Sequence, residues 1–483
     1  MKNILVFDVG TTSMKCILYN EKFKELFATS IEYSIETKDG IIAQLDANIY
    51  FDTFTECVQS VLNSGINKED ISAISFTTQG ETLIPVDKCG NPLCKAIVWL
   101  DSRAFKEAEY IKQNITCEEF YKTTGLCDID GAVPIAKLLY IRRNNPSVYE
   151  RVYKFLLLED YLIFRLTGQF VSEKSLQSST GWYDITGDKL FDKVFEICNI
   201  EKEKIPQILP CGTDVGVVTN EAAKITGLYK NTHIITAAMD QISSAIGAGN
   251  IKEGIVTETT GTALVVGATV KNPDFDISNP ITVYKHYNNM FVYMPYFPTA
   301  GIVHKWFRNT VFPEVNQKAE TLGVSPYTLI EEEAKLSPPG SNGVIFNPDF
   351  SSGGSFSGLN LSSARADLAR SVQEGIAYVL RELLEQLELK GVDIAGVYSL
   401  GGGSYSSFWT QIKASVCGKD CSTIGYSETT ALGAAIMAST ALGIYKDVSE
   451  ALLVADNVSV TYHPISSEKK IYDKCFEIYK KLK

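Results

Sequence analysis

The stretch FDVGTTSMKC, residues 7–16, decides the fold of this chain. A short apolar run ends at Asp8, and a second apolar run follows Lys15. Gly10 and three hydroxyl side chains lie between them, so the segment predicts two strands joined by a polar turn. Glycine lets the main chain approach a ligand closely, and successive backbone N–H groups form a nest that binds an anion.

The carboxylate of Asp8 adds a condition to this interpretation. It would repel a bare phosphate, so its place beside an anion site makes sense only if a cation lies there too. Mg²⁺ prefers oxygen ligands and keeps several waters, so one carboxylate acting largely through water is enough to hold it. We therefore expect a phosphate–magnesium turn with Asp8 as the metal ligand. The alternative is an ordinary hairpin with a polar turn.

The totals favour a globular protein of two domains. A chain of 483 residues exceeds the size at which a single core keeps growing. With 45 basic and 57 acidic side chains the net charge is −12, which argues against nucleic acid or an anionic membrane as a partner. No apolar run reaches the roughly 18 residues of a membrane helix. The eleven cysteines form no C-x-x-C pair, so we expect reduced thiols in a cytoplasmic protein.

Strand-like and helix-like stretches alternate along the chain, which predicts an α/β fold. Apolar residues at helical spacing predict a helix that Asp46 caps and Gly65 ends, followed by a strand at residues 71–76. A longer helical run, from Val372 to Gly391, precedes a strand at residues 397–400.

A second Gly/Thr turn lies in GIVTETTGTALVVGA, residues 254–268, about half a chain from the first. Two such turns suggest two related halves with a boundary near residue 245, joined by a hinge rather than a long linker. SLGGGSYSSFW, residues 399–409, is a strand followed by three glycines, which suits close approach of the backbone to a nucleotide. The chain contains neither a Walker loop nor the spaced glycines of a Rossmann fingerprint.

Six segments, in this order, resemble motifs of the FGGY family of carbohydrate kinases, which includes glycerol kinase and xylulokinase. DVGTTSMK resembles the first phosphate motif, and TTQGETLIPVD and AIVWLDSRA resemble sugar-site segments. GAVPIAKLLYIRRN (131–144) resembles the first family signature, with Tyr140 where Trp is usual. AAMDQISSAIGAG (237–249) resembles the catalytic Asp segment, and GGSFSGLNLSSARADLARSVQEGIAY (353–378) resembles the second signature.

The resemblance covers essentially the whole chain and implies two actin-like (ribonuclease H-like) ATPase domains with a deep interdomain cleft. The N-terminal domain, residues 1–245, would bind the sugar and carry the first phosphate turn. The C-terminal domain, residues 246–483, would bind the nucleotide. The implied reaction is phosphorylation of a hydroxyl of a small sugar or polyol by ATP with Mg²⁺. The interpretation leaves room for a homodimer.

The resemblance also assigns site residues. Asp240 would be the general base, although an Asp at this point also suits a helix N-cap. The residues expected to bind the sugar are Gln79, Gly80, Glu81, Asp240 and Gln241. Those expected to bind the nucleotide and its phosphates are Thr11, Thr12, Ser13, Lys15, Gly261, Thr262, Gly301, Lys305, Gly402, Gly403 and Ser407. Glycerol kinase has amides where Lys305 and Ser407 stand, and Lys305 also suits a solvated helix position.

Other candidates have more ordinary interpretations. His304, on a helix that also contains Trp, is expected to be structural. Asp101 is expected to pair with Arg103 or to cap a helix, with a direct sugar contact as the alternative. The run Glu331–Glu333 is expected to be a solvated helix face.

The sugar-site segment TTQGET predicts the size of the substrate. Glycerol kinases read TNQRET there, and an Arg–Glu pair grips the triol, whereas this chain has Gly80 and Glu81. Alignment on Lys137 places Ala132 where the aromatic residue of the glycerol site stands. We therefore expect a larger, xylulokinase-like substrate, a C4–C6 ketose or polyol. Glycerol kinase, an actin-like ATPase that acts on a protein partner, and a sugar sensor without catalysis are the alternatives.

Overall fold

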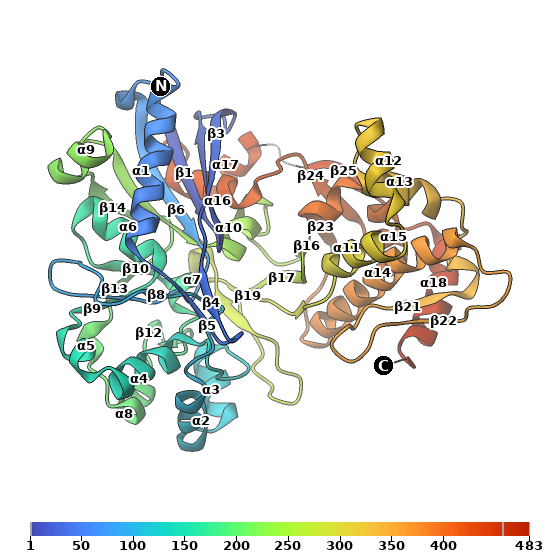
Figure 1. Cartoon of the computed structure of the whole chain (residues 1–483), viewed down its shortest axis with the longest axis horizontal. Helices are drawn as coiled ribbons and strands as arrows, with labels where there is room; N and C mark the ends of the chain where they lie inside the picture. The colour runs from blue at the N-terminus through green and yellow to red at the C-terminus, as the bar shows by residue number, and fades with distance from the viewer. Residues whose placement is uncertain (1, 456–457, 483) are drawn as a thin grey trace. The chain divides into compact units, whose positions relative to one another are not determined.

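The structure is a computed structural model that describes residues 2–455 and 458–482 (Figure 1). By packing, the chain divides into two compact units, and each is assembled from three separate stretches. The first unit comprises Met1–Gly249, Lys271–Val292 and Glu428–Asp456. The second comprises Asn250–Val270, Tyr293–Ser427 and Asn457–Lys483.

A six-stranded mixed sheet forms the centre of the first unit, in the order β14-β15-β6-β1-β2-β3. β1 and β2 are the antiparallel hairpin predicted around residues 7–16, and β6 runs parallel to both β1 and β15. These strands are β14 (Asp214–Val217), β15 (His233–Met239), β6 (Ile71–Thr78), β1 (Asn3–Val9), β2 (Ser13–Tyr19) and β3 (Glu25–Glu32).

Short strands and helices complete the first unit. The strands are β4 (Glu36–Lys38), β5 (Ile42–Leu45), β7 (Ile84–Val86), β8 (Ala96–Ile97), β9 (Lys154–Leu156), β10 (Val171–Glu173), β11 (Tyr183–Asp184), β12 (Lys189–Leu190), β13 (Gln207–Leu209) and β18 (Val283–Lys285). The helices are α1 (Asn48–Asn63), α2 (Phe105–Asn114), α3 (Cys117–Thr124), α4 (Pro134–Asn144), α5 (Pro146–Arg151), α6 (Leu158–Thr167), α7 (Lys174–Gln177), α8 (Asp192–Cys198), α9 (Asn220–Thr226), α10 (Asp240–Gly247), α16 (Thr429–Ala441) and α17 (Val448–Ala455).

Helices cover both faces of the main sheet. On one face, α1 and α6 share a core with Leu5 and Phe7 of β1. Successive side chains of a strand point to opposite faces, so Asp8 lies on the other face. There α16 packs against β1, β6 and β15, and Figure 1 shows this orange-red helix beside the blue strands. A helix from late in the sequence thus covers strands from its beginning within the first unit.

The crossing of α10 and α16 depends on two glycines. A Cβ atom added to Gly247 would lie 2.0 Å from the carbonyl oxygen of Thr429, and one added to Gly433 would lie 1.9 Å from that of Ser243. Neither position has room for a side chain, so the backbones of the two helices touch directly. This contact holds α10, whose first residue is Asp240, against α16.

The second unit is built on the strand order β17-β16-β23-β24-β25, with β20 paired to β17. The predicted second Gly/Thr turn joins β16 to β17, and β16 runs parallel to β23. The strands are β16 (Ile255–Thr260), β17 (Leu264–Val270), β20 (Tyr296–Phe297), β21 (Ile345–Asn347), β22 (Ser355–Ser357), β23 (Gly396–Leu400), β24 (Cys421–Ile424) and β25 (Val458–Tyr462); β19 (Phe291–Tyr293) lies where the chain leaves the first unit. The helices are α11 (Gly301–Thr310), α12 (Glu314–Leu322), α13 (Pro326–Ala334), α14 (Arg365–Leu389), α15 (Ser407–Cys417) and α18 (Ser466–Tyr479).

Two predicted helices differ from the structure at their first turns. α14 begins at Arg365 rather than near Val372, because the Asp367 carboxylate accepts a hydrogen bond from the N–H of Ala364 at 2.8 Å and caps an earlier start. α1 begins at Asn48 with Ala47, rather than the predicted Asp46, at the N-cap position; the Asp46 carboxylate lies one residue earlier and accepts from the Asn48 N–H at 3.0 Å. In the described ranges, no helix has both the length and the apolar character needed to span a membrane.

The variant Gly433→Ala tests the helix crossing. Its methyl group would meet the Ser243 carbonyl at 1.9 Å, and backbone cannot rotate away as a side chain can. We expect the free energy of unfolding to fall by about 2–4 kcal/mol, measured by urea titration. Gly396→Ala is the control, because its Cβ would meet only the Asp420 oxygen at an ordinary 3.7 Å. Equal stability of both variants would contradict this account.

Candidate active site

The turn between β1 and β2 presents the first predicted phosphate site. The N–H of Gly10 donates to the carbonyl of Ser13 at 3.0 Å and closes the turn, and Tyr33 donates its hydroxyl proton to the carbonyl of Gly10. Ser13 is half-buried at this turn, and Thr12 is exposed. Lys15 lies opposite Asp8 in the hairpin register. The segment therefore brings main-chain groups, hydroxyls and a cation to one end of the sheet.

The hydroxyl of Thr11 joins this turn to two sugar-site segments. It donates to Oε1 of Gln79 at 3.2 Å, and it accepts a hydrogen bond from the indole N–H of Trp99 at 2.9 Å. Gln79 follows β6 and is buried, with its N–H donated to the carbonyl of Val9 at 3.1 Å. Three of the motifs singled out in the sequence are therefore in direct contact within the first unit.

Little positive charge compensates the carboxylate of Asp8. Burial raises the pKa of its carboxyl to about 6, against the lowering effect of Lys15, and Glu428 raises it further. Glu428 itself lies 2.8 Å from Lys15 Nζ and takes up part of that cation's charge. Within the described residues, no group of three or more His, Cys, Asp or Glu side chains is arranged to hold a metal. A single poorly compensated carboxylate fits an ion that keeps most of its waters, as Mg²⁺ does.

Gly80 and Glu81 form a strained turn after β6. The N–H of Thr82 donates to the carbonyl of Gly80 at 2.9 Å, and Glu81 between them has a φ of 66°, so the three residues make a γ-turn. A non-glycine residue in this conformation costs roughly 1–3 kcal/mol and persists where its surroundings hold it, often at functional sites. A Cβ on Gly80 would lie 2.9 Å from the sulfur of Met239, so this glycine lets the turn lie against the residue before Asp240.

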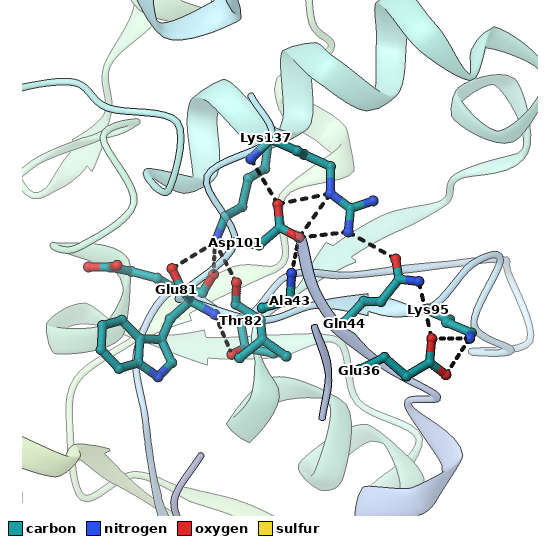
Figure 2. A network of polar contacts seen from close by, with 11 residues as sticks. Glu36, Ala43, Gln44, Glu81, Thr82, Lys95, Asp101 and Lys137 are labelled. Atoms are coloured by element: carbon teal, nitrogen blue, oxygen red, sulfur yellow. Dashed lines mark hydrogen bonds and ion pairs between the residues drawn. The ribbon is translucent and has the colours of Figure 1, made fainter. Parts of the chain in front are cut away.

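A buried lysine supports the turn from behind (Figure 2). Nζ of Lys137, on α4, donates to the carbonyls of Val98 at 3.0 Å, Glu81 at 3.2 Å and Trp99 at 3.4 Å. Burial lowers the pKa of Lys137 to about 8, although Glu81 acts to raise it. Burial likewise raises the pKa of Glu81 to about 7, with Lys137 opposing.

Asp101 belongs to the same network and is fully buried. Nη2 of Arg103 donates to its Oδ2 at 2.6 Å, and the N–H of Ala43 donates to the same oxygen at 2.7 Å. Nε of Arg103 donates to Oδ1 at 2.8 Å. The pairing with Arg103 expected from the sequence is therefore present, and it ties the loop after β8 to β5.

Asp240 stands where β15 ends and α10 begins. The N-cap position belongs to Met239, so Asp240 is the first helical residue rather than the cap that its sequence also allowed. Its Oδ1 accepts a hydrogen bond from the N–H of Gln241 at 2.7 Å. Burial raises the pKa of Asp240 to about 7, Asp8 adds to the rise, and the Gln241 N–H opposes it. A carboxyl with a pKa near neutrality suits proton transfer.

The buried charge of Asp240 should cost stability in a pH-dependent way. Because its pKa rises on folding from 3.8 to about 7, the folded state loses stability as the pH rises across this range. We expect Asp240→Asn to raise the Tm of the ligand-free protein by roughly 2–4 °C at pH 8 and by less at pH 5. Asp52→Asn, on the exposed side of α1, serves as the control. A Tm gain independent of pH would refute this.

The second unit holds a cavity of about 530 Å³, within the usual size range for a small-ligand site. It is lined by Thr260, Gly261, Thr262, Gly301, Ile302, His304, Lys305, Ser325, Tyr327, Thr328, Glu331, Gln373, Gly402, Gly403, Tyr405, Ser406 and Trp409. Six residues predicted to bind the nucleotide are among them: Gly261, Thr262, Gly301, Lys305, Gly402 and Gly403.

Close backbone contacts shape this cavity. A Cβ on Gly301 would lie 2.0 Å from the carbonyl oxygen of Gly261, so α11 begins directly against the β16–β17 turn. The N–H of Ile302 donates to the carbonyl of Thr262 at 3.2 Å. A Cβ on Gly403 would lie 2.9 Å from that of Thr260. Gly301 and Gly403 therefore have a structural reason of their own, whereas a Cβ on Gly402 would meet nothing within 4 Å.

The structure places Ser406, not Ser407, at the cavity wall. Ser406 is the N-cap of α15: its Oγ accepts from the N–H of Trp409 at 3.0 Å and donates to Oε2 of Glu331 at 2.5 Å. The expectation that Glu331 lies on a solvated face is therefore wrong, because a contact from 75 residues away draws it into the wall. The Ser ahead of an amphipathic run was the available signal for Ser406.

Aromatic rings complete the wall and were missed in the sequence. His304 packs against Tyr327, with ring centroids 4.9 Å apart, and against Trp409 at 5.2 Å. Burial lowers the pKa of His304 to about 4, so it is neutral at physiological pH. This agrees with the structural role expected for it.

Paired alanine variants separate the two serines. Ser406→Ala removes both the cap and the bond to Glu331, so we expect a several-fold weaker affinity for ADP and a loss of about 1 kcal/mol in the free energy of unfolding. Ser407→Ala should change the affinity for ADP less than about twofold, because Ser406 and not Ser407 makes the helix cap and the bond to Glu331. Calorimetric titration with ADP measures both, and a larger effect at Ser407 would contradict the assignment.

Comparisons with known proteins match one family over most of the chain. Residues 3–247 match the N-terminal domain, and residues 256–442 the C-terminal domain, of the FGGY family of carbohydrate kinases. The chain is 25% identical to the xylulose kinase of Staphylococcus xylosus, covering 99% of both chains. It is 26% identical to the gluconokinase of Bacillus licheniformis, covering 99% of this chain and 94% of that one. The ligand-bound xylulose kinase structure from Lactobacillus acidophilus superposes with a TM-score of 0.90 at 27% identity, covering 100% and 98%.

Proposed function

The chain belongs to the FGGY family of carbohydrate kinases, with the family's two-domain actin-like ATPase fold, and we propose that it phosphorylates a hydroxyl of a C4–C6 ketose or polyol with ATP and Mg²⁺. The observation that carries this proposal is the position of Asp240. It begins α10, its pKa is raised to about 7, and the γ-turn of Glu81 packs against the residue before it.

Phosphoryl transfer to an alcohol requires an acceptor for the alcohol proton. Asp240 takes that proton in our proposal, because its carboxylate is ionised only with difficulty and regains stability when protonated. The side chains of Gln79, Glu81 and Gln241 would orient the sugar through hydrogen bonds to its hydroxyls, since carboxylates accept and amides both donate and accept. The strained turn at Gly80 and Glu81 would keep the acceptor oxygens in place.

Each of the two hairpin turns offers groups that would bind a phosphate. Thr11, Thr12, Ser13 and Lys15 lie at the first turn, and Gly261 and Thr262 lie at the second. Asp8 would hold Mg²⁺ largely through water, and the ion would supply neutralising charge at the phosphates. In the cavity of the second unit, Gly301, Lys305, Gly402 and Gly403 would contact the nucleotide, with Ser406 in the place expected for Ser407.

The size of the sugar follows from the sugar-site segment. Gly80 and Ala132 stand where the resemblance to glycerol kinases places a large cation and a ring, which supports a substrate longer than glycerol. The relatives named above are a xylulose kinase and a gluconokinase, and their names state a sugar and a sugar acid as substrates. The rival function, an ATPase that acts on a protein partner, explains neither the γ-turn nor the position of Asp240 beside it.

A coupled assay for ADP release tests this proposal. ATP turnover should be slow alone and rise with xylulose, ribulose or erythritol, while kcat/KM for glycerol should be at least roughly 100-fold below that of the best substrate. Asp240→Asn should reduce kcat by roughly 100-fold or more, with sugar and nucleotide affinities within several-fold. Turnover indifferent to every sugar would favour the ATPase, and a variant that keeps a tenth of the rate would exclude Asp240 as the base.

A further inference from the structure

We infer that the sugar site selects an uncharged ketose or polyol and rejects substrates that carry a carboxylate, such as aldonic acids. This inference rests on the proposed function, because it names the substrate class of the same site. The relatives do not decide the matter, since the xylulose kinase is 25% and the gluconokinase 26% identical to this chain. The inference is based on three carboxylates at the site and on the neighbouring cations, which already bind other groups of the protein.

Two of the carboxylates come from adjacent points of the backbone. The contact of Gly80 with Met239 brings together the residues that follow each of them, Glu81 and Asp240. The charge of Asp240 reaches Glu81, because it raises the pKa of that carboxyl. Any substrate bound at this point must coexist with the anionic form of Asp240, since that form accepts the proton.

The third carboxylate is Asp130, just before α4. Its Oδ1 accepts from the N–H of Ala132 at 2.8 Å and from that of Val133 at 3.2 Å, which holds the side chain at the start of the helix. Asp130 also raises the pKa of Glu81, so it lies within electrostatic reach of that group. Ala132, which stands where the resemblance to glycerol kinases places a ring, therefore lies next to an acidic side chain.

The cations next to these carboxylates are already engaged (Figure 2). An ammonium group has three protons, and Lys137 directs hydrogen bonds to three backbone carbonyls. Arg103 directs Nε and Nη2 to Asp101, and Nη2 also to Gln44 at 2.9 Å. Lys137 and Arg103 therefore support the loops of the site and face backbone or protein side chains rather than a substrate carboxylate.

The combination favours hydroxyls over carboxylates. Glu81, Asp130 and Asp240 against Lys137 leave an excess of negative charge at the turn, and a substrate carboxylate would add to it. A sugar hydroxyl, by contrast, donates a proton to a carboxylate and gains a charge-assisted hydrogen bond. For two substrates of similar length, one ending in a carboxylate and the other in a carbinol, kcat/KM should therefore differ by roughly 100-fold or more in favour of the carbinol.

The test compares D-gluconate with neutral substrates in the full-length enzyme. At pH 8, with saturating Mg²⁺ and ATP, we expect kcat/KM for gluconate to lie at least roughly 100-fold below that of the best of xylulose, ribulose and erythritol. Glu81→Gln removes one negative charge and should narrow this ratio by about 10-fold, even though both rates fall. The matched control is Glu36→Gln, which removes the same charge from an exposed ion pair with Lys95 in the same network.

The outcomes separate the inference from the function beneath it. Gluconate used as well as the neutral sugars, or a ratio that Glu36→Gln changes as much as Glu81→Gln, would overturn the inference and leave the kinase intact. ATP turnover that no compound stimulates would count against the proposed function instead. In that case calorimetric titration with the same compounds still tests the inference. Gluconate that binds more tightly than the neutral sugars would overturn it. If Glu81→Gln does not fold, Asp130→Asn removes another of the three negative charges and should narrow the ratio in the same direction.

Discussion

The direct contact of two helix backbones, at Gly247 and Gly433, is the constraint on which the rest of the first unit depends. Because no side chain separates the helices there, α10 is held close to α16, and α16 in turn lies on β1, β6 and β15. The first residue of α10 then has one position relative to the sheet. For this reason the carboxylate of Asp8 is close enough to Asp240 to raise its pKa.

Partial burial of its carboxylates gives the site its chemical character. Asp8, Glu81 and Asp240 all have raised pKa values, and burial is the largest cause in each case. Each group is therefore more strongly drawn to a proton or a cation than a carboxylate in water. The protein accepts unfavourable charge burial and a strained backbone at Glu81, and well-formed helices and sheets elsewhere sustain them.

The parts of this structure that could be predicted from the sequence are those with local causes. Both hairpins have apolar strands and a Gly/Thr turn, and these signals lie within about fifteen residues. The glycines of the nucleotide cavity were found because their motif is local as well. The start of α14 was placed too late, because it depends on one side-chain hydrogen bond from Asp367.

Other features have causes that no short segment contains. Glu331 joins the cavity wall because Ser406 reaches it from another element, and the sequence around Glu331 is indistinguishable from a solvated helix. The left-handed conformation of Glu81 has no signal at all, because glutamate does not favour positive φ. The position of Lys137 could be aligned with the family motif, but its role could not be predicted, because its partners are three carbonyls on two separate loops.

The division of each unit into three stretches of chain bears on how the protein is made. A ribosome releases residues 1–249 long before α16, which covers one face of the sheet that these residues form. During that interval the face of β1 and β6 opposite α1 lacks its native cover, and nascent apolar surface of this kind is prone to aggregation. Completion of the first unit must therefore wait until almost the whole polypeptide has been synthesised, so its N-terminal half is a natural client for chaperones.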